Sequence, residues 1–222
     1  MRNKNKFLSF ILLIAVFIFI LTFSIGLPIY IRPFYYVQID LLEIEEFSGY
    51  DRDTIIEAYD DVLDYLTIPG KDFSCGKLAY TDDGRSHFED CKVLFSLNAI
   101  AFCVSTAIIV ILLLLRRKNP QIKYKLGKFS PQFYASIGLV GVLIALLVSI
   151  LIDFDTTFEI FHKLFFYGKD NWIFDPRYDE VIMILPEGFF MNSAILIILN
   201  VVFISLVIIF LEFKRKRDKN EY

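Results

Sequence analysis

FLSFILLIAVFIFILTFSIGLPIY, residues 7–30, carries no charged side chain from end to end. A helix needs about 20 apolar residues to cross the ~30 Å hydrocarbon layer of a bilayer, and this run is long enough. Three further runs, 93–115, 133–152 and 194–211, meet or approach that length. The sequence therefore predicts four membrane-spanning helices.

The overall composition agrees with an integral membrane protein. Of the 222 residues, 56% are hydrophobic, and the 24 Phe and 12 Tyr are outside the usual range of a soluble domain. The basic start MRNKNK is like the first part of a signal peptide. However, the apolar stretch after it is longer than the roughly 7–15 residues of such a signal, and no small-residue cleavage site follows. We expect the first run to be retained as a span.

Charged residues predict the orientation of the four spans. Lysine and arginine gather on one side of a four-span arrangement, and the positive-inside rule makes that side cytoplasmic. The other two loops are acidic, with Asp and Glu outnumbering Lys and Arg by 15 to 6 in residues 31–92 and by 8 to 3 in residues 153–192. Both termini are therefore expected inside. The basic clusters are Arg2, Lys4 and Lys6; Arg116, Arg117, Lys118, Lys123, Lys125 and Lys128; and Lys214, Arg215, Lys216, Arg217 and Lys219.

These patterns predict a mainly α fold. We expect one integral membrane domain over residues 1–222, a bundle of four transmembrane helices with a short inner loop, 116–132. The outer loops, 31–92 and 153–193, would form a small extracytoplasmic cap with interfacial helices. Since no soluble domain accompanies the basic clusters, binding to anionic lipid headgroups is favoured over binding to nucleic acid.

The first outer loop is expected to begin with YYVQIDLLEIEEF, residues 35–47, as a strand or extended segment. Residues 48–66 have apolar side chains at helical spacing, which predicts an amphipathic helix that packs against the bundle or lies among the headgroups. Ser48, Asp51 or Asp53 would cap its start, and Ile-Pro-Gly at 68–70 would end it.

The second outer loop is unusually aromatic. Residues 153–166 predict an interfacial helix with a phenylalanine-rich face that includes Phe166, followed by a turn at Asp175–Pro176. Trp172 fits the aromatic belt at headgroup level. Belt anchoring accounts for these rings, but it leaves a histidine and several acids among them unexplained.

The chain has two histidines, His87 and His162, and both fall in the outer loops. If the second span extends outward as a helix, His87 and Asp90 share one helical face. A carboxylate there would hold one imidazole tautomer or favour the protonated ring, whereas the acids alone are more simply a solvated helix start. Two groups that titrate near neutral pH on one side of the membrane point to chemistry at that face.

Two of the cysteines, Cys75 and Cys91, also lie in the first outer loop. A bridge between them would enclose His87 and contribute about 3 kcal/mol in the chain-entropy model. Two free thiols are the alternative, and the sequence leaves both open.

Three segments together resemble the bacterial lipoprotein intramolecular transacylase family. They are FHKLFFYGKDNWIFDPRYDEVIMILPEGFF at 161–190, HFEDCK at 87–92 and AYDDVLDYL at 58–66. The resemblance covers nearly the whole chain, and the long motif is the specific one. The chain departs from the family at two places. Family members often have an aliphatic residue where this chain has Cys91. They also often have an acid before the first histidine, where this chain has Gly84, Arg85 and Ser86.

The resemblance implies an acyltransferase of bacterial cell membranes whose active site lies on the extracytoplasmic face. Its substrates would be diacylated lipoproteins, and it would move the sn-2 acyl chain of the diacylglyceryl-cysteine to the cysteine's own α-amine, giving a lyso-form lipoprotein. The cyclic transition state would contain N, Cα, Cβ, S, two glycerol carbons, the ester oxygen and the carbonyl carbon. Since amide formation from an ester is downhill, no cofactor, metal or nucleotide is expected.

The chemistry suits histidine. The α-amine must lose a proton as it attacks and the glycerol oxygen must gain one, which a histidine can relay near neutral pH. We expect His162 to be the proton shuttle and His87 its electrostatic or orienting partner, although these roles could be reversed. Candidate supporting residues are Asp90, Asp155 and Asp175, and candidate contacts to the acyl or glyceryl groups are Phe166 and Trp172.

Other functions fit the same residues less well. A non-catalytic scaffold would use the aromatic loop for docking and leave the histidines incidental. A haem protein would use His87 and His162 as axial ligands, but such histidines usually project from within a bundle. Zinc hydrolysis is poorer still, because two histidines outside any metal motif make a weak site.

Overall fold

A computed structural model describes residues 2–220, with side chains for residues 5–218. The side chains of Arg2, Lys4 and Lys219 in the basic clusters therefore lie outside the described residues. Within the described chain there is no β-strand, and four helices are long and apolar enough to cross a membrane. Each contains one predicted run, which confirms the mainly α, four-span fold class. They are α1 (Arg2–Tyr30), α5 (Asp82–Lys118), α6 (Pro131–Ile152) and α9 (Glu187–Asn220).

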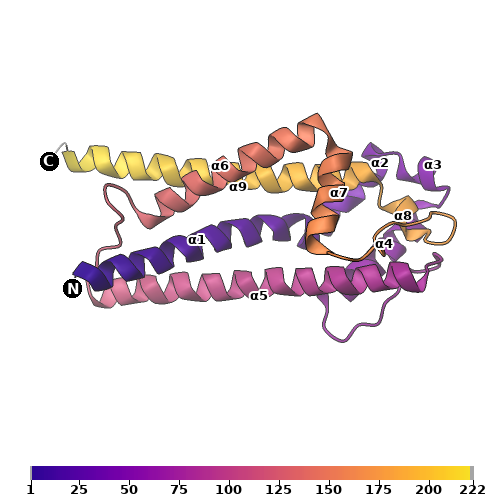
Figure 1. Cartoon of the computed structure of the whole chain (residues 1–222), viewed down its shortest axis with the longest axis horizontal. Coiled ribbons are helices and arrows are strands. Elements are labelled where there is room, and N and C mark those ends of the chain that lie inside the picture. Colours follow the sequence, from indigo (N-terminus) through magenta and orange to yellow (C-terminus); the bar gives the residue numbers. More distant parts are fainter. Residues whose placement is uncertain (1, 221–222) are drawn as a thin grey trace. The chain divides into compact units, whose positions relative to one another are not determined.

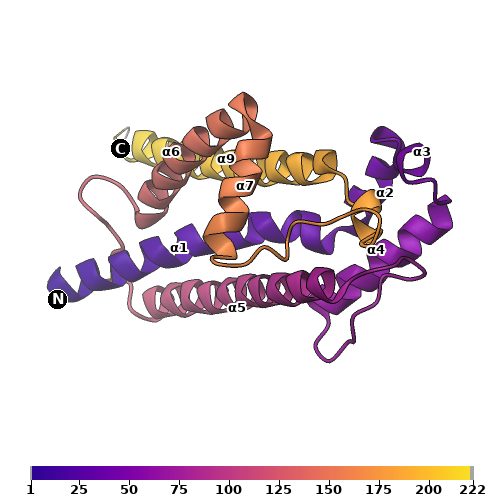
Figure 2. The same ribbon diagram turned by 45° about the vertical axis from the view of Figure 1, so that its right-hand side comes forward.

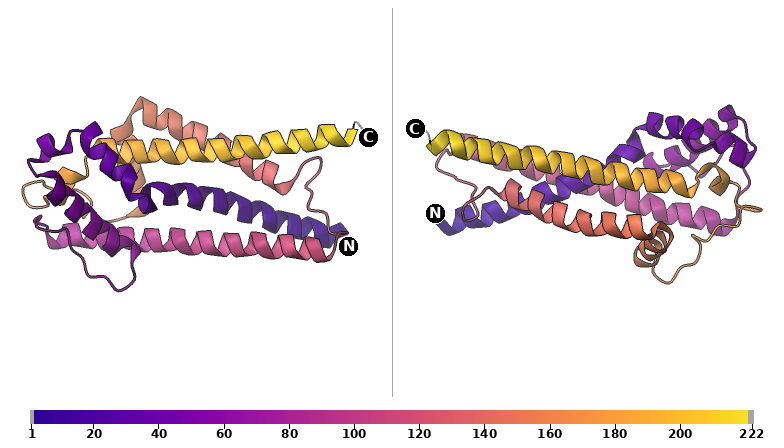
Figure 3. Two further views of the ribbon diagram at one scale, coloured as in Figure 1. Left: turned by 180° about the vertical axis from the view of Figure 1, so that it is seen from behind. Right: turned by 90° about the horizontal axis from the view of Figure 1, so that it is seen from above.

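The chain divides into two compact units. The bundle unit comprises residues up to 26, 98–148 and from 196 onward, and the loop unit comprises 27–97 and 149–195. In the bundle unit the four helices run side by side (Figures 1 and 3). The start of α1, the end of α9 and the α5–α6 connection lie at the same end of this unit, as four alternating spans require.

Polar side chains link the helices of the bundle unit. Asn98 of α5 donates to the Thr22 carbonyl of α1 at 3.2 Å, and Asn200 of α9 donates to the Ser24 hydroxyl of α1 at 2.8 Å. Between α1 and α5, Phe19 stacks on Phe102 with ring centroids 5.5 Å apart. Because hydrocarbon offers no alternative partner to an amide, such bonds orient neighbouring helices.

The predicted strand at 35–47 is wrong, because this segment forms α2 (Arg32–Leu41) and α3 (Ile44–Ser48). Pro33 stands in the first turn of α2, where its fixed φ and missing N–H suit a helix start. Tyr35, Gln38 and Ile39 are buried together, which is helical spacing rather than strand spacing. Glu43, with φ of 50°, separates the two helices.

The predicted amphipathic helix is confirmed as α4 (Arg52–Thr67), and Asp51 is its cap, accepting from the Thr54 amide at 2.9 Å. Within the loop unit α4 lies beside α2 and α8 (Val181–Ile184), as Figure 2 shows, and its apolar side chains are buried. Tyr59 stacks on Tyr35 with centroids 3.7 Å apart, and the Tyr35 hydroxyl donates to the Ile184 carbonyl at 2.6 Å. Packing within the loop unit thus buries the apolar face of α4.

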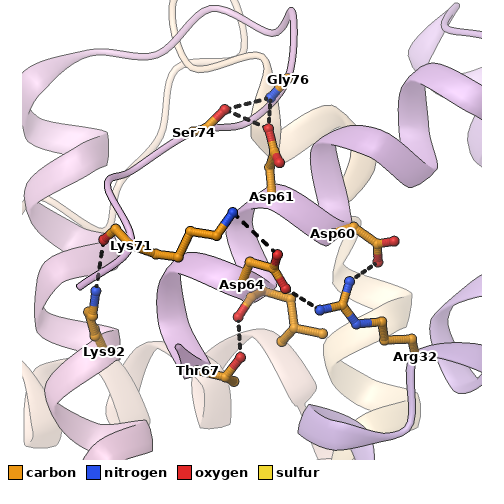
Figure 4. A network of polar contacts seen from close by, with 10 residues as sticks. Arg32, Asp60, Asp61, Asp64, Thr67, Lys71, Ser74, Gly76 and Lys92 are labelled. Atoms are coloured by element: carbon orange, nitrogen blue, oxygen red, sulfur yellow. Dashed lines mark hydrogen bonds and ion pairs between the residues drawn. The ribbon is translucent and has the colours of Figure 1, made fainter. Parts of the chain in front are cut away.

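Ion pairs join α4 to the start of α2 and to the loop that follows α4 (Figure 4). The guanidinium of Arg32 lies between Asp60, at 2.9 Å, and Asp64. Lys71 reaches Asp64 at 3.6 Å, and Asp61 accepts from the Ser74 hydroxyl at 2.6 Å. The acidic face of α4 therefore holds both neighbouring segments by charge and hydrogen bonding.

Replacing Arg32 with glutamine should leave Asp60 and Asp64 facing each other without a cation between them. The free energy of unfolding should fall by about 1 kcal/mol, since Arg32 and Asp60 are each about one-third exposed. Arg32 also holds the pKa of Asp64 below its ordinary value. This stabilisation is present above the unfolded carboxyl pKa of about 3.9 and is lost as the pH falls through the folded pKa.

Thermal unfolding in detergent, measured against pH, checks both points. Lys163→Gln is the matched control, because Lys163 is 66% exposed in its pair with Glu159. Equal melting temperatures for the two variants would contradict the role given to Arg32.

Candidate active site

His87 lies on the part of α5 that precedes the apolar run. This part begins at Asp82, so the second span does extend outward as a helix, which is the condition for His87 and Asp90 to share one helical face. Thr81 caps its start by accepting from the Gly84 amide at 3.0 Å. His87 sits within the second turn and is only 6% exposed.

His162 lies on α7 (Phe154–Phe165), which Asp153 caps by accepting from the Thr156 amide at 3.0 Å. His162 is 7% exposed and belongs to the same loop unit as His87. The two imidazole centroids are 5.8 Å apart and their planes differ by 32°. Both histidines of the chain therefore meet in one site.

The hydrogen bonding of His162 determines its tautomer. Nδ1 is 2.8 Å from the Phe158 carbonyl oxygen, which can only accept, so Nδ1 carries the proton. In the neutral ring Nε2 then offers a lone pair. Burial lowers the pKa of His162, while the bond to the Phe158 carbonyl acts in the opposite direction. The imidazole of His162 is therefore in its neutral form near pH 7 and is available to accept a proton.

Aromatic rings enclose the histidine pair. Trp172 stacks on His162 with centroids 4.8 Å apart, and Phe166 touches both imidazoles, at 4.7 Å from His87 and 5.6 Å from His162. Phe174 lies 5.5 Å from His87. Phe166 and Trp172 were predicted site residues. Phe174 was missed, although it stands in the same aromatic motif.

Cys91 is in polar contact with His87. Its sulfur is 3.4 Å from His87 Nε2, whereas His87 Nδ1 is buried without a hydrogen-bond partner among the described residues. No bridge joins Cys91 to Cys75, and both are free thiols. Cys75 instead donates to the Leu78 carbonyl at 3.2 Å. Of the two alternatives left by the sequence, the structure has the free thiols.

Asp90 acts on His87 by charge, because it raises the pKa of that imidazole against the larger lowering caused by burial. It pairs with Lys169 at 2.5 Å and accepts from the Asn171 amide at 3.1 Å, while Asn171 also donates to Ser86 at 3.3 Å. Within the described chain no hydrogen bond joins Asp90 to either imidazole. Asp90 therefore connects α5 to the loop that carries Trp172. Sequence reasoning missed Ser86, Lys169 and Asn171, because a polar partner is defined only by the fold.

The other two predicted acids are not brought to the histidine pair. Asp175 pairs with Arg177 at 2.6 Å, which lowers the pKa of Asp175 to about 2 and makes it unsuitable as a base. Asp155 lies beside Glu187. Within the described residues, no three His, Cys, Asp or Glu side chains come together as a metal site.

A buried carboxylate joins the second outer loop to the start of α5. Asp179, 5% exposed, accepts from the Thr81 amide at 2.8 Å and from its hydroxyl at 2.9 Å. A negative group is favourable at a helix N-terminus. A side chain on Gly84 would overlap the Asp179 carboxylate, so a residue without Cβ is needed there.

The fold and the site define a class: a multi-pass helical membrane protein with two buried imidazoles enclosed by aromatic rings. The model of the lipoprotein intramolecular transacylase family Lit matches residues 10–190. The chain belongs to this family, and it is accordingly an acyltransferase integral to the membrane. Comparison with curated protein sequences gave no match.

Solved structures agree with the family assignment. The membrane-integral lipoprotein intramolecular transacylase Lit from Bacillus cereus is 27% identical, with all of both chains covered and a TM-score of 0.88. A histidine-to-arginine variant of that protein is 26% identical over 99% of this chain and 95% of the other, with a TM-score of 0.79. A histidine-to-alanine variant is 27% identical over 97% and 96%, with a TM-score of 0.78.

Gly84→Ala should displace the Asp179 carboxylate from Thr81, lower the free energy of unfolding by about 1–3 kcal/mol and reduce transacylase activity, because the start of the helix carrying His87 must shift. Thermal unfolding and turnover of a lipopeptide substrate test this. Gly141→Ala is the matched control, since Gly141 is helical and has open space at Cβ. Equal behaviour of the two variants would show that Gly84 has no special role.

Proposed function

We propose that the chain moves the sn-2 acyl chain of a lipoprotein's diacylglyceryl-cysteine to that cysteine's own α-amine, which leaves a lyso-form lipoprotein. The observation that carries this proposal is the buried pair His87 and His162 in a member of the transacylase family. The nucleophile belongs to the substrate, so the protein need supply only proton transfer, orientation and stabilisation of charge.

The proposed reaction balances within one substrate molecule. The α-amine nitrogen attacks the sn-2 ester carbonyl carbon, a C–N bond forms, and the nitrogen gives up a proton. The bond from the carbonyl carbon to the glycerol oxygen then breaks, and that oxygen takes a proton. An ester and an amine become an amide and an alcohol, with no water consumed and no change in mass.

His162 is suited to relay that proton. Its Nδ1–H is engaged with the Phe158 carbonyl, so the neutral ring has its lone pair on Nε2. Nε2 would accept the proton from the amine and return it to the departing glycerol oxygen. The lowered pKa of His162 keeps the accepting form populated at neutral pH. His87 would be the electrostatic partner, close enough to act on the same carbonyl group.

The aromatic enclosure would support the reaction in two ways. Phe166 and Trp172 offer apolar surface to the acyl chains and the glyceryl group, and they keep water from competing with the amine for the ester. Closing a flexible ring of substrate atoms is costly in entropy, so holding the amine near the carbonyl would contribute much of the acceleration.

We place the protein in a bacterial cell membrane as a single domain with the histidine pair on the extracytoplasmic side and both termini in the cytoplasm. The basic clusters and the acidic loops support this orientation. Diacylated lipoproteins would be substrates and membrane lipids the surroundings, with no role for nucleic acid or nucleotide. Asp90 would position the loop bearing Trp172 rather than contact the substrate.

The family membership favours an enzyme over a scaffold. A haem between His87 and His162 is disfavoured by the ring of Phe166, which lies against both imidazoles. A scaffold would tolerate loss of His162, which the next experiment measures.

His162→Asn should lower acyl transfer by about 10²–10⁴-fold, because the amide keeps a donor for the Phe158 carbonyl but removes the base. The assay expresses each variant in cells that make only diacylated lipoproteins and analyses the N-terminal lipopeptide by mass spectrometry. The wild-type product should have unchanged mass, with one acyl group now resistant to mild alkali.

Lys163→Gln is the control on the same helix, since Lys163 is 66% exposed and pairs with Glu159. Undiminished transfer by His162→Asn would exclude His162 as the base. An increase in mass would point to transfer from a phospholipid and contradict the proposed reaction.

The pH dependence should separate the amine from the histidine. Log kcat/KM should fall with slope one below the amine pKa of about 8, and with slope two only below the pKa of His162. Because burial lowers that pKa, the second break should come below the ordinary histidine value of about 6.5. A break to slope two at or above 6.5 would be inconsistent with a buried base.

A further inference from the structure

The surroundings of His87 are unusual for a buried imidazole. The residue is 6% exposed, and Nδ1 has no hydrogen-bond partner among the described residues. Buried polar atoms in folded proteins are nearly always paired. An unpaired ring nitrogen inside a site therefore points to a partner supplied by a bound molecule.

The type of partner depends on which nitrogen of His87 carries the proton. The other nitrogen, Nε2, is 3.4 Å from the sulfur of Cys91. If the thiol donates to Nε2, then Nδ1 carries the proton and is a free donor. If Nε2–H donates to sulfur instead, Nδ1 is a free acceptor.

The chemistry of the pair favours donation by the thiol. A thiol has an ordinary pKa of about 8.5, so it holds its proton at neutral pH unless a cation lies against it. Burial and the negative charge of Asp90 raise the pKa of the Cys91 thiol. Of the two nearby lysines, Lys92 lies over the Tyr65 ring and Lys169 is paired with Asp90. An imidazole lone pair also accepts a hydrogen bond far better than a thiol sulfur does.

We propose that Cys91 is a positioning residue that holds His87 in the tautomer with the proton on Nδ1. This inference rests on the function proposed above. In this tautomer His87 presents Nδ1–H to the ester carbonyl oxygen of the substrate, which gains negative charge as the amine adds. The two histidines then offer opposite groups to one substrate. His162 offers a lone pair on Nε2, and His87 offers a proton on Nδ1.

Nitrogen NMR of protein labelled with ¹⁵N in histidine tests the tautomer directly. The chain has two histidines and therefore four ring signals. We expect two protonated Nδ1 signals and two unprotonated Nε2 signals, with the His87 pair assigned by its loss in His87→Gln. A protonated Nε2 on His87 would overturn the proposal.

Kinetics test the consequence. Cys91→Ala removes the donor and should lower kcat about tenfold with little change in KM, since the bond to the carbonyl oxygen strengthens only in the transition state. Its NMR spectrum should show Nε2 partly protonated. Cys91→Ser, whose hydroxyl also donates, should recover most of the rate and of the Nδ1–H signal.

Cys75→Ala is the matched control, because Cys75 is a buried thiol that donates to the Leu78 carbonyl rather than to a histidine. It should leave kcat and both histidine spectra unchanged. Equal losses in Cys91→Ala and Cys91→Ser would attribute the effect to packing and overturn the role of the donor, as would an unaltered rate in Cys91→Ala.

The two proposals can fail separately. If the wild-type protein relocates no acyl group in the lipopeptide assay, the proposed reaction is wrong whatever the tautomer of His87. If it relocates the group but the spectrum shows Nε2 protonated, only the role of Cys91 is wrong.

Discussion

The site depends on the contact between the carboxylate of Asp179, in the loop after α7, and Thr81 at the start of α5. The carboxylate accepts from both the amide and the hydroxyl of Thr81, and Gly84 leaves the room for it. This contact fastens the loop after α7 to the helix that carries His87. Since His162 ends up 5.8 Å from His87 by ring centroid, a small shift at this junction would separate the two imidazoles. A helix held at its start is a more precise support for a catalytic ring than a free loop.

Burial gives the histidine pair its chemical character. Rings on several sides remove water from His87 and His162, and the polar bonds to these imidazoles come from a backbone carbonyl and a thiol. Burial lowers the pKa of both imidazoles, that of His87 to about 4 despite the opposing charge of Asp90, so the rings favour their neutral forms. A neutral pair can accept one proton and donate another within a single substrate, which is what an exchange of ester for amide requires.

Sequence reasoning succeeded where the pattern is local. The aromatic motif at 161–190 and the amphipathic helix of residues 48–66 follow from neighbouring residues, and Asp51 is one of the three caps that the sequence offered. It failed at residues 35–47, where a partial alternation of apolar and polar residues hid the helical spacing of Tyr35 and Ile39. It also named Asp155 and Asp175 as support for the histidines, whereas the structure pairs Asp175 with Arg177 and has Asp155 beside Glu187; proximity in sequence gives no information on which group an acid faces.

The sequence by itself determined the four membrane spans, the acidic character of the outer loops and the presence of two histidines among aromatic residues, because apolar length and charge are properties of single segments. Only the tertiary structure decided that His87 and His162 meet, that Asp90 bonds Lys169 rather than an imidazole, and that Cys91 contacts His87 instead of Cys75. The histidine pair and the Asp90 bond join segments far apart in the chain. They depend on how α7 and the following loop pack on α5, which no local pattern encodes.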